Sequence, residues 1–361
     1  MSGDSELHRD SVVDDKVLFR PDDTVLVTGA AGFIGCRVVA SLVERGAERV
    51  RCFVRPTSRI ERLQEVRAQS PGAVELVSGN LLSREDCSAA ASGVSVAYHL
   101  AAGSGRSFAA VYMDTVVATR NLLDALLENG SLRRFVNVSS FAVYANESLR
   151  RGAVLDERCP IESPPHRRAE AYCYAKIKQD QLVEEYGRRR QLPYVTLRPG
   201  TVYGPGKLGL TGRIGVDTFG PFLHVGGGIR LPLTYVDNCA DAVVLAGTAT
   251  GVEGEVFNVV DDEPLRSREF LRAYKRSVGW FLSIRVPYPL AYLLSYLWER
   301  YSARSKGQLP PVFNRSRCSA EWKGNAYDNR KIKTLGWKPR VPQDEAMRRF
   351  LEYQRHAKEI G

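Results

Sequence analysis

The first half of the chain alternates short apolar runs with longer stretches in which apolar residues recur every three or four positions. Unbroken apolar runs are typical of strands that are buried on both faces of a parallel sheet. The segment 25–28 is of this kind, and further short β-rich runs cover 50–54, 74–78, 96–101, 135–139 and 194–197. The helical spacing covers 34–44, 115–127 and 169–188. This alternation predicts an α/β fold with a doubly wound parallel sheet.

The pattern changes after the Gly204-Pro205-Gly206 segment, and a second glycine run at Gly226-Gly227-Gly228 interrupts it again. Residues 207–361 lack the simple alternation, and we expect them to form a smaller C-terminal substrate lobe. Within that range, residues 234–262 are expected to return to the main domain. The predicted organisation is therefore a flexible N-terminal tail over 1–22, a main domain over 23–206 and the lobe.

The composition is that of a soluble globular protein, because 44% of the 361 residues are hydrophobic and 25% are charged. The start of the chain is polar and has no apolar core of the signal-peptide type. The seven cysteines are scattered, odd in number and without a Cys-x-x-Cys pair. We therefore expect reduced thiols, a cytoplasmic location and no metal site.

The chain is basic, with a formal net charge of +10 at pH 7. Arginine doublets such as Arg133-Arg134, Arg150-Arg151 and Arg167-Arg168 are not interleaved with aromatic residues, which argues against nucleic-acid binding. One interpretation is a solvated basic surface. The other is attraction of an anionic ligand or a membrane surface.

Three glycines follow the first predicted strand and lead into the first predicted helix. Gly29, Gly32 and Gly35 stand in Thr28-Gly29-Ala30-Ala31-Gly32-Phe33-Ile34-Gly35. A turn without side chains lets backbone N–H groups and the helix N-terminus meet a pyrophosphate. This loop, with Phe33 and Ile34, is therefore predicted to bind a dinucleotide, and the main domain to be of the Rossmann type.

The end of the second predicted strand bears on the choice between NAD and NADP. An acidic residue about 20 residues after the loop would accept a hydrogen bond from a free ribose 2′-hydroxyl. This chain instead has Arg55, followed by Ser58 and Arg59. Because these side chains can hold a 2′-phosphate through charge-assisted hydrogen bonds, we favour NADP over NAD. If Arg55 only stacks on the adenine, NAD is equally acceptable.

A candidate catalytic set lies in the middle of the chain. Tyr172 and Lys176 are one turn apart on a predicted helix, and Ser140 precedes them. A nearby ammonium group lowers the pKa of a tyrosine from its usual ~10. Tyr172 can then take a proton from a substrate alcohol while the nicotinamide takes a hydride, with Ser140 bonded to the substrate oxygen.

The same helix carries a second copy of this spacing in Tyr174 and Lys178. The Tyr-x-x-x-Lys spacing is common by chance, so the choice between the two copies needs a physical reason. We prefer Tyr172 and Lys176 because the small side chain of Ala175 lets the helix approach the cofactor.

Together these residues resemble the extended short-chain dehydrogenase/reductase family, also called the NAD-dependent epimerase/dehydratase family. The resemblance extends from about residue 23 to residue 354. The matching segments are 27–35, His99-Leu100-Ala101-Ala102, Val138-Ser139-Ser140-Phe141-Ala142-Val143-Tyr144, the Tyr172/Lys176 pair, 197–206, Tyr235-Val236-Asp237-Asn238 and Leu335-Gly336-Trp337-Lys338-Pro339.

The resemblance implies roles for the matched positions. It implies that Ser140, Tyr172 and Lys176 are catalytic and that Tyr172 and Lys176 also contact the cofactor. Further cofactor contacts are implied for Asn80 and Leu81 at the adenine, for Ala101 and Ala102 along the cofactor path, and for Pro199 and Val202 at the nicotinamide.

Two departures from the family pattern bear on the chemistry. The usual Asn-Val-x-Gly-Thr is replaced by Thr115-Val116-Val117-Ala118-Thr119. This replacement leaves open whether the hydrogen bond that the family forms behind its active site is present. Dehydratase members place an Asp-Glu pair after the catalytic Ser or Thr, whereas this chain has Phe141-Ala142. We therefore do not expect dehydration.

The expected function is the NAD(P)-dependent interconversion of a secondary alcohol and a ketone, as an oxidoreductase or an epimerase acting on a small-molecule substrate. A sugar nucleotide or related carbohydrate is favoured, and an apolar alcohol of the 3β-hydroxysteroid type is the alternative. A non-catalytic dinucleotide-binding sensor is an alternative of another class. The family resemblance also implies a homodimer.

The apolar-alcohol alternative rests on the segment 287–298, which looks like an apolar helix of 3β-hydroxysteroid dehydrogenase-like members. Arg300, Arg304 and Lys306 follow it. The segment is shorter than the ~17–25 residues of a membrane span. It is either a lobe-packing helix, a lid over an apolar substrate or a peripheral membrane contact.

Overall fold

The computed structural model describes residue 20 and residues 23–105, 107–218, 220–305, 308–309 and 313–360. The predicted flexible tail over 1–22 therefore lies outside the described residues, apart from Arg20, and so does Lys306.

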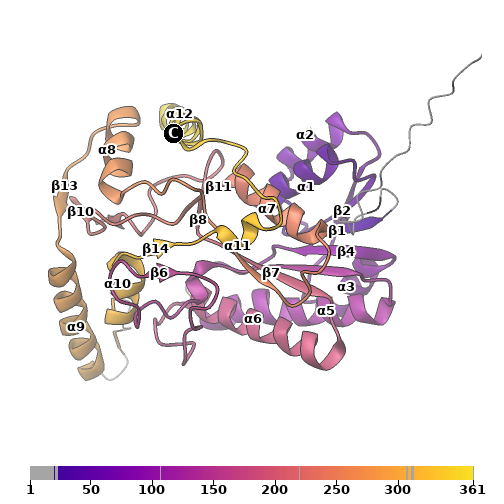
Figure 1. The fold of residues 1–361 in the computed structure, drawn as a ribbon, viewed down its shortest axis with the longest axis horizontal. Coiled ribbons are helices and arrows are strands. Elements are labelled where there is room, and N and C mark those ends of the chain that lie inside the picture. Colours follow the sequence, from indigo (N-terminus) through magenta and orange to yellow (C-terminus); the bar gives the residue numbers. More distant parts are fainter. Residues whose placement is uncertain are drawn as a thin grey trace, which may run out of the picture.

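A seven-stranded parallel sheet forms the centre of the main domain (Figure 1). Its strand order is β12-β7-β5-β4-β1-β2-β3, and neighbouring strands pair in parallel. The strands are β1 (Thr24–Thr28), β2 (Arg49–Val54), β3 (Val74–Ser78), β4 (Val94–His99), β5 (Arg134–Val138), β7 (Tyr194–Pro199) and β12 (Val256–Val259). The Rossmann-type doubly wound sheet predicted from the sequence is thus confirmed.

The central strands form because their residues are apolar and fully enclosed. In β1, Val25, Leu26 and Val27 have no exposed surface. Branched side chains of this kind pack well on a pleated sheet, and burial on both faces explains why the run is unbroken.

Helices cover both faces of this sheet (Figure 1). One face is covered by α1 (Gly35–Glu44) and α7 (Val236–Thr248), which pack against each other. The other face is covered by α3 (Arg84–Ala91), α5 (Ala118–Asn129) and α6 (Ala171–Arg190). The short helix α2 (Glu61–Gln69) follows β2 and packs against α1.

The helix predicted over 115–127 differs from the observed one at its start. The chain first forms α4 (Phe108–Tyr112) and then one turn of π-helix, η1 (Met113–Val117), before α5 begins. A π-turn holds an extra residue, so it rotates the side chains that precede it. At the other end, α5 stops at Gly130, whose φ of 70° is the left-handed conformation typical of helix ends.

The C-terminal lobe packs small sheets against helices beside the main domain. Its three-stranded sheet contains β9 (Gly215–Val216), β10 (Phe222–His224) and β13 (Ser283–Arg285). Two strand pairs join β8 (Thr201–Tyr203) to β11 (Leu233–Tyr235) and β6 (Val154–Leu155) to β14 (Ala326–Tyr327). The helices are α8 (Ser267–Ser277), α9 (Tyr288–Arg304), α10 (Arg315–Trp322), α11 (Arg330–Lys333) and α12 (Gln343–Ile360).

The chain crosses between the main domain and the lobe more than once. Residues 234–262 contain α7 and β12, and β12 pairs with β7 at the edge of the main sheet. In contrast, β6 lies within 23–206 in the sequence but pairs with β14. The lobe therefore also takes in part of the segment between β5 and α6.

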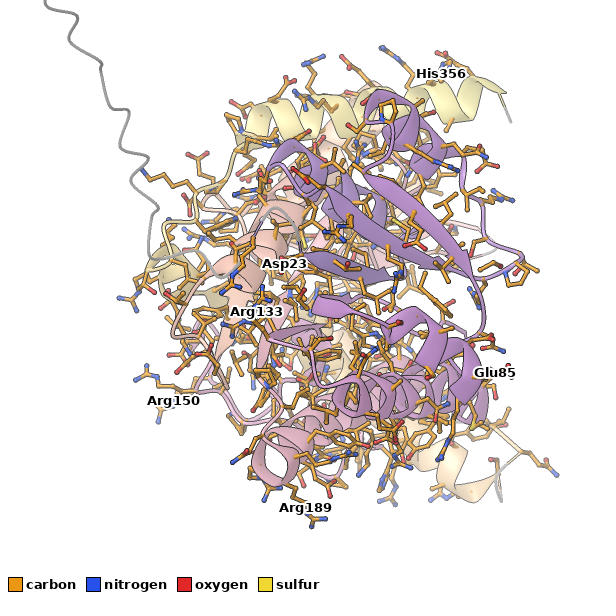
Figure 2. All side chains as sticks on the ribbon, turned by 90° about the vertical axis from the view of Figure 1, so that its right-hand side faces the viewer. Asp23, Glu85, Arg133, Arg150, Arg189 and His356 are labelled. Atoms are coloured by element: carbon orange, nitrogen blue, oxygen red, sulfur yellow. The ribbon has the colours of Figure 1, made fainter. Side chains whose placement is uncertain are left out.

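The amino-terminal edge of the sheet is held by an ion pair between Asp23, just before β1, and Arg133, just before β5 (Figure 2). Ser95 adds a hydrogen bond from its Oγ to Asp23 Oδ1 at 3.1 Å. Burial opposes ionisation of Asp23, but the bonds from Arg133 and Ser95 lower its pKa. Arg150 and Arg189 are exposed to solvent, in line with a solvated basic surface (Figure 2).

Candidate functional site

The glycine loop lies where the strand order reverses between β1 and β4, at the carboxyl ends of the strands. Ligands of doubly wound sheets bind at this point. Gly29 has a φ of 69°, and a Cβ added there would lie 2.8 Å from the backbone nitrogen of Ala101. A Cβ on Gly35 would lie 2.1 Å from the oxygen of Gly29, whereas one on Gly32 would lie 3.0 Å from the same atom. Gly29 and Gly35 are therefore needed for the tight turn and for close packing of α1.

A cavity of about 390 Å³ opens beside this loop. Its walls come from the glycine loop, the ends of β2 and β3 and the segment after β4, which is the arrangement expected for the adenosine half of a dinucleotide. The predicted cofactor residues that line it are Gly29, Gly32, Arg55, Ser58, Asn80, Leu81, Ala101 and Ala102.

The other predicted cofactor residues lie outside this cavity. Ile34 is the N-cap residue of α1, and Phe33 packs with it against the core. Pro199 ends β7, and the backbone oxygen of Val202 accepts a hydrogen bond from Lys207 Nζ at 3.2 Å. Their contacts with a nicotinamide stay predictions, as do those of Tyr172 and Lys176.

The cavity also contains residues that the sequence analysis missed. Phe53 lines it from the end of β2. Its position at the carboxyl end of a buried strand could have indicated from the sequence that it faces the ligand site. Asp114 lines it from η1. No sequence pattern indicated Asp114, because its direction depends on the π-turn.

Ser140 and Tyr172 meet at the carboxyl end of β5. Ser140 precedes the 3₁₀ turn η2 (Phe141–Val143), and its Oγ accepts a hydrogen bond from the backbone nitrogen of Ala142 at 3.2 Å. Burial raises the pKa of Tyr172 to about 12, while its hydrogen bond with Ser140 acts in the opposite direction. A bond that favours the phenolate is one in which the serine hydroxyl donates.

Lys176 lies one turn further along α6 and is almost completely buried. Its Nζ donates to the backbone oxygen of Val138 at 2.8 Å and to Oε1 of Gln179 at 2.8 Å. Burial lowers its pKa to about 8, and the nearby carboxylate of Asp180 acts in the opposite direction. In this structure burial outweighs any effect of the ammonium, so the pKa of Tyr172 is raised and not lowered as the sequence predicted.

The second Tyr-x-x-x-Lys copy has a different environment. Tyr174 packs against the rings of Phe108 and Tyr112, with centroid distances of 5.7 Å and 6.2 Å. Lys178 Nζ donates to Oε1 of the exposed Gln181 at 3.1 Å. The structure therefore brings Ser140 to Tyr172 and leaves Tyr174 among aromatic rings.

A buried arginine supports the segment that carries Ser140. Arg168 pairs with Glu162, and both side chains are at most 5% exposed. Arg168 also donates to the backbone oxygens of Ala142, at 3.1 Å, and of Tyr144. Cys173, next to Tyr172, contacts the same Ala142 oxygen through its Sγ at 2.9 Å.

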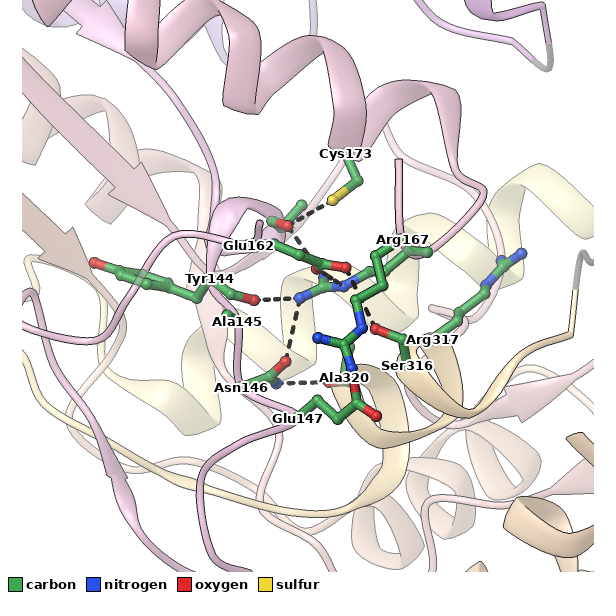
Figure 3. Close-up of polar contacts among 12 residues, drawn as sticks. Tyr144, Ala145, Asn146, Glu147, Glu162, Arg167, Cys173, Ser316, Arg317 and Ala320 are labelled. Carbon is green, nitrogen blue, oxygen red and sulfur yellow. Dashed lines mark hydrogen bonds and ion pairs between the residues drawn. The ribbon is translucent and has the colours of Figure 1, made fainter. Parts of the chain in front are cut away.

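The same cluster reaches the lobe (Figure 3). Ser316 of α10 donates to Glu162 at 3.3 Å, and Asn146 donates to the backbone oxygen of Ala320 at 3.1 Å. Arg167 and Glu147 form a second ion pair at 3.3 Å at the edge of the cluster (Figure 3). The segment after Ser140 is thus anchored to α10 as well as to α6.

The lobe contains an apolar cavity of about 460 Å³ between α9 and the strands β9 and β10. Its lining residues are Val216, Leu223, Val225, Val286, Ala291, Leu294, Ser295, Leu297, Trp298, Tyr301, Phe313 and Trp322. A second cavity of about 650 Å³ shares Val216, Phe313 and Trp322 with it. The apolar walls of the first of these two cavities suit an apolar ligand.

Within the described residues, no three His, Cys, Asp or Glu side chains are grouped closely enough to hold a metal ion. None of the helices there combines the length and the apolar character that crossing a membrane requires.

Comparison with known proteins gives the family. A sequence profile of the NAD dependent epimerase/dehydratase family matches residues 25–259. The chain is 27% identical to 3beta-hydroxysteroid-dehydrogenase/decarboxylase isoform 1 of Arabidopsis thaliana, over 92% of this chain and 80% of that protein. It is also 27% identical to 2-alkyl-3-oxoalkanoate reductase of Stenotrophomonas maltophilia, over 90% of this chain and 98% of that protein.

Solved structures show the same architecture. UDP-glucuronic acid 4-epimerase from Bacillus cereus, in complex with NAD, superposes with a TM-score of 0.69 at 22% identity, over 93% of this chain and 99% of that one. At 22% identity, the similarity to this epimerase supports a shared fold and no more. The profile match covers well over half of the chain, so this protein belongs to the NAD-dependent epimerase/dehydratase family and is an enzyme of the extended short-chain dehydrogenase/reductase type.

Proposed function

We propose that this protein is an NAD(P)-dependent oxidoreductase that interconverts a secondary alcohol and a ketone. The observation that carries the proposal is the contact between Ser140 and Tyr172, with Lys176 one turn away on the same helix. A nicotinamide dinucleotide, when bound, supplies the hydride chemistry.

In this mechanism Tyr172 takes the proton of the substrate hydroxyl, and in the reverse direction it returns it. Ser140 donates a hydrogen bond to the substrate oxygen. The Lys176 ammonium favours the tyrosine phenolate and bonds the nicotinamide ribose. General acid–base catalysis of this kind contributes a factor of roughly 10² to 10⁴ to the rate.

For the cofactor we propose NADP rather than NAD. Arg55, Ser58 and Arg59 all line the cavity beside the glycine loop. Two guanidinium groups there favour a ligand that carries an additional phosphate. Asp114 lines the same cavity, and we expect its carboxylate to act against that preference.

For the substrate we propose an apolar secondary alcohol of the hydroxysteroid or hydroxyalkanoate kind, and keep a sugar nucleotide as the second candidate. This reverses the order favoured from the sequence. The activities of the two relatives, on a 3β-hydroxysteroid and on a 2-alkyl-3-oxoalkanoate, and the apolar cavity beside α9 support the change. The sugar-nucleotide hypothesis is supported by the fold that this chain shares with the UDP-glucuronic acid 4-epimerase.

We further propose that α9 touches a membrane surface without crossing it. Leu290, Leu293, Leu294 and Leu297 on this helix are each about half exposed, and Arg300 and Arg304 follow at its end. Apolar side chains next to basic ones are typical of interfacial helices. The homodimer and the cytoplasmic location stay expectations that rest on the resemblance and on composition.

The test is an assay of the purified full chain with NADP⁺ and NAD⁺ against 3β-hydroxysterols, β-hydroxy acids with long alkyl chains and UDP-sugars. We expect reduction of NADP⁺ with one of the two apolar classes. Tyr172→Phe should remove at least 99% of this turnover while dinucleotide binding is retained, and Tyr174→Phe should leave turnover intact. Dinucleotide binding without turnover of any class would favour the sensor alternative.

A further inference from the structure

A line of buried hydrogen bonds runs from Lys176 into the main domain. Gln179 lies three residues after Lys176 on α6 and has no exposed surface. Its Oε1 accepts the bond from Lys176 Nζ at 2.8 Å, and its Nε2 donates to Oγ1 of Thr119 at 2.9 Å. Gln179 therefore connects the catalytic helix to α5.

The line continues through His99 to the first strand. Thr119 Oγ1 donates to the backbone oxygen of Thr115 at 2.5 Å and lies 2.8 Å from Nε2 of His99. His99 Nδ1 lies 2.7 Å from Oγ1 of Thr28. Burial, helped by the charge of Lys176, lowers the pKa of His99 to about 3, so the ring is neutral and carries one proton.

These contacts determine the direction of every bond. The single hydroxyl hydrogen of Thr119 goes to Thr115, so its oxygen can only accept from His99 and Gln179. His99 is therefore protonated on Nε2, and its Nδ1 accepts from Thr28. For the same reason the amide nitrogen of Gln179 faces Thr119, and its oxygen faces Lys176.

The donors of Lys176 can then be counted. An ammonium group has three N–H donors. One goes to Val138 and one to Gln179, and no third acceptor contacts Nζ within the part of the chain that the structure describes. One donor is left for a bound ligand.

We propose that Gln179 is a positioning residue that fixes the direction of the Lys176 ammonium, so that its remaining N–H is held for a ribose hydroxyl of the dinucleotide. This inference rests on the proposed function of the site. The sequence left open whether a hydrogen bond forms behind the active site when Thr115 and Thr119 replace the usual family residues. Both side chains form such bonds. The Thr115 hydroxyl accepts from the backbone nitrogen of Gly103 at 2.9 Å, and the Thr119 hydroxyl accepts from Gln179.

The same helix supplies a matched control. Gln181 stands three residues after Lys178 and accepts from its Nζ at 3.1 Å, but on the exposed side of α6. The two lysine–glutamine pairs have the same spacing and differ in burial. Only the buried pair is expected to affect ligand binding.

The experiment compares Gln179→Met, Gln179→Glu and Gln181→Met in the full chain. NADPH binding is measured by fluorescence titration, and binding of 2′,5′-ADP, which lacks the nicotinamide ribose, by calorimetry. The pKa of Lys176 is followed by ¹³C NMR, with its signal assigned by its loss in Lys176→Arg. Thermal unfolding shows that each variant is folded.

Gln179→Met should weaken NADPH binding about tenfold, the effect of one lost hydrogen bond to a charged group. It should leave 2′,5′-ADP binding unchanged and lower the pKa of Lys176, because a partner of the charged form is lost. Gln179→Glu keeps the acceptor for Lys176 but loses the donor to Thr119, whose hydroxyl must then turn from Thr115 to the carboxylate. It should retain NADPH affinity and raise that pKa.

Equal weakening of both ligands by Gln179→Met, no weakening at all, or the same effect from Gln181→Met would each overturn the inference. The readouts need no substrate, so this result is separate from the proposed function. If NADPH binds and responds as described but no alcohol is turned over, the role of Gln179 stands and the oxidoreductase proposal fails.

Discussion

Lys176 donates a hydrogen bond from its Nζ to the backbone oxygen of Val138 at 2.8 Å, which ties α6 to the last residue of β5. Ser139 and Ser140 follow Val138 directly. The two parts of the proposed catalytic set are therefore joined through the main chain as well as through the contact between Ser140 and Tyr172.

The depressed pKa of Lys176 makes stability depend on pH. The pKa of Lys176 is about 8 in the folded protein and 10.5 for an unperturbed lysine, so the unfolded chain binds more protons between these two pH values. The contribution of Lys176 to the free energy of unfolding should then rise with pH across this window, by up to about 3 kcal/mol. Urea unfolding of wild type and Lys176→Met at pH 7, 8.5 and 10 measures this change. A constant difference between the two proteins would contradict it, and Lys178→Met serves as the exposed control.

Arg55 should control cofactor choice. Arg55→Ala removes a guanidinium from the cavity beside the glycine loop, so we expect NADPH binding to weaken about tenfold or more and NADH binding to change little. Fluorescence titration with both cofactors measures the ratio. Arg67→Ala changes an exposed arginine of α2 that does not line the cavity and should leave the ratio unchanged. Equal affinities for both cofactors in the wild type would remove the NADP proposal.

Gly35 should tolerate no side chain. In Gly35→Ala the new Cβ would lie 2.1 Å from the oxygen of Gly29, so the turn or the helix must shift. We expect a loss of about 1–3 kcal/mol in the free energy of unfolding, as in overpacked cores. A Cβ added to Gly228 would meet no atom within 4 Å, so Gly228→Ala should change stability by less than about 0.5 kcal/mol. Similar denaturation midpoints for both variants would refute the packing role.

Substitution of the two adjacent arginines before α6, Arg167 and Arg168, should have very different effects on the free energy of unfolding. Arg168→Met leaves the buried carboxylate of Glu162 without its partner, which typically costs about 3–5 kcal/mol. Arg167 pairs with Glu147 but is 54% exposed, so Arg167→Met should cost at most about 1 kcal/mol. Chemical denaturation of both variants makes the comparison, and a small loss for Arg168→Met would show that the cluster does not anchor the segment.

The exposed leucines of α9 should mediate membrane contact. Leu294→Glu with Leu297→Glu places two charges on the apolar face, so binding to vesicles that contain phosphatidylserine should fall about tenfold or more. Co-sedimentation measures the bound fraction. Leu208 is 64% exposed and lies outside α9, so Leu208→Glu should bind like the wild type. Failure of the wild type to bind vesicles would rule the contact out.

The parts of the fold that could be predicted from sequence are those that depend on local patterns. The unbroken apolar run of β1 and the spacing of Gly29, Gly32 and Gly35 each reflect short-range requirements, namely burial on both faces and a turn without side chains. The relation of Tyr172 to Lys176 is likewise set by one helical turn. These elements were found close to their observed bounds.

The missed features depend on residues that are distant in sequence. Gln179 has a role only because α5 places Thr119 opposite it, 60 residues earlier in the chain. Arg168 and Glu162 look like ordinary surface residues until α10 covers them. A strongly charged side chain gives no sequence signal of being buried, since such residues are mostly exposed.

The pairing of β6 with β14 has a consequence for how the protein is made. These strands are more than 170 residues apart, and Asn146 also bonds to Ala320 across a similar interval. On the ribosome, the segment after Ser140 emerges long before its partners in the lobe. Contacts this distant in sequence form slowly, because a long loop must close first. The main-domain sheet can begin to assemble during synthesis, but the support around the proposed catalytic serine is completed only after β14 (Ala326–Tyr327) has emerged, near the end of the 361-residue chain.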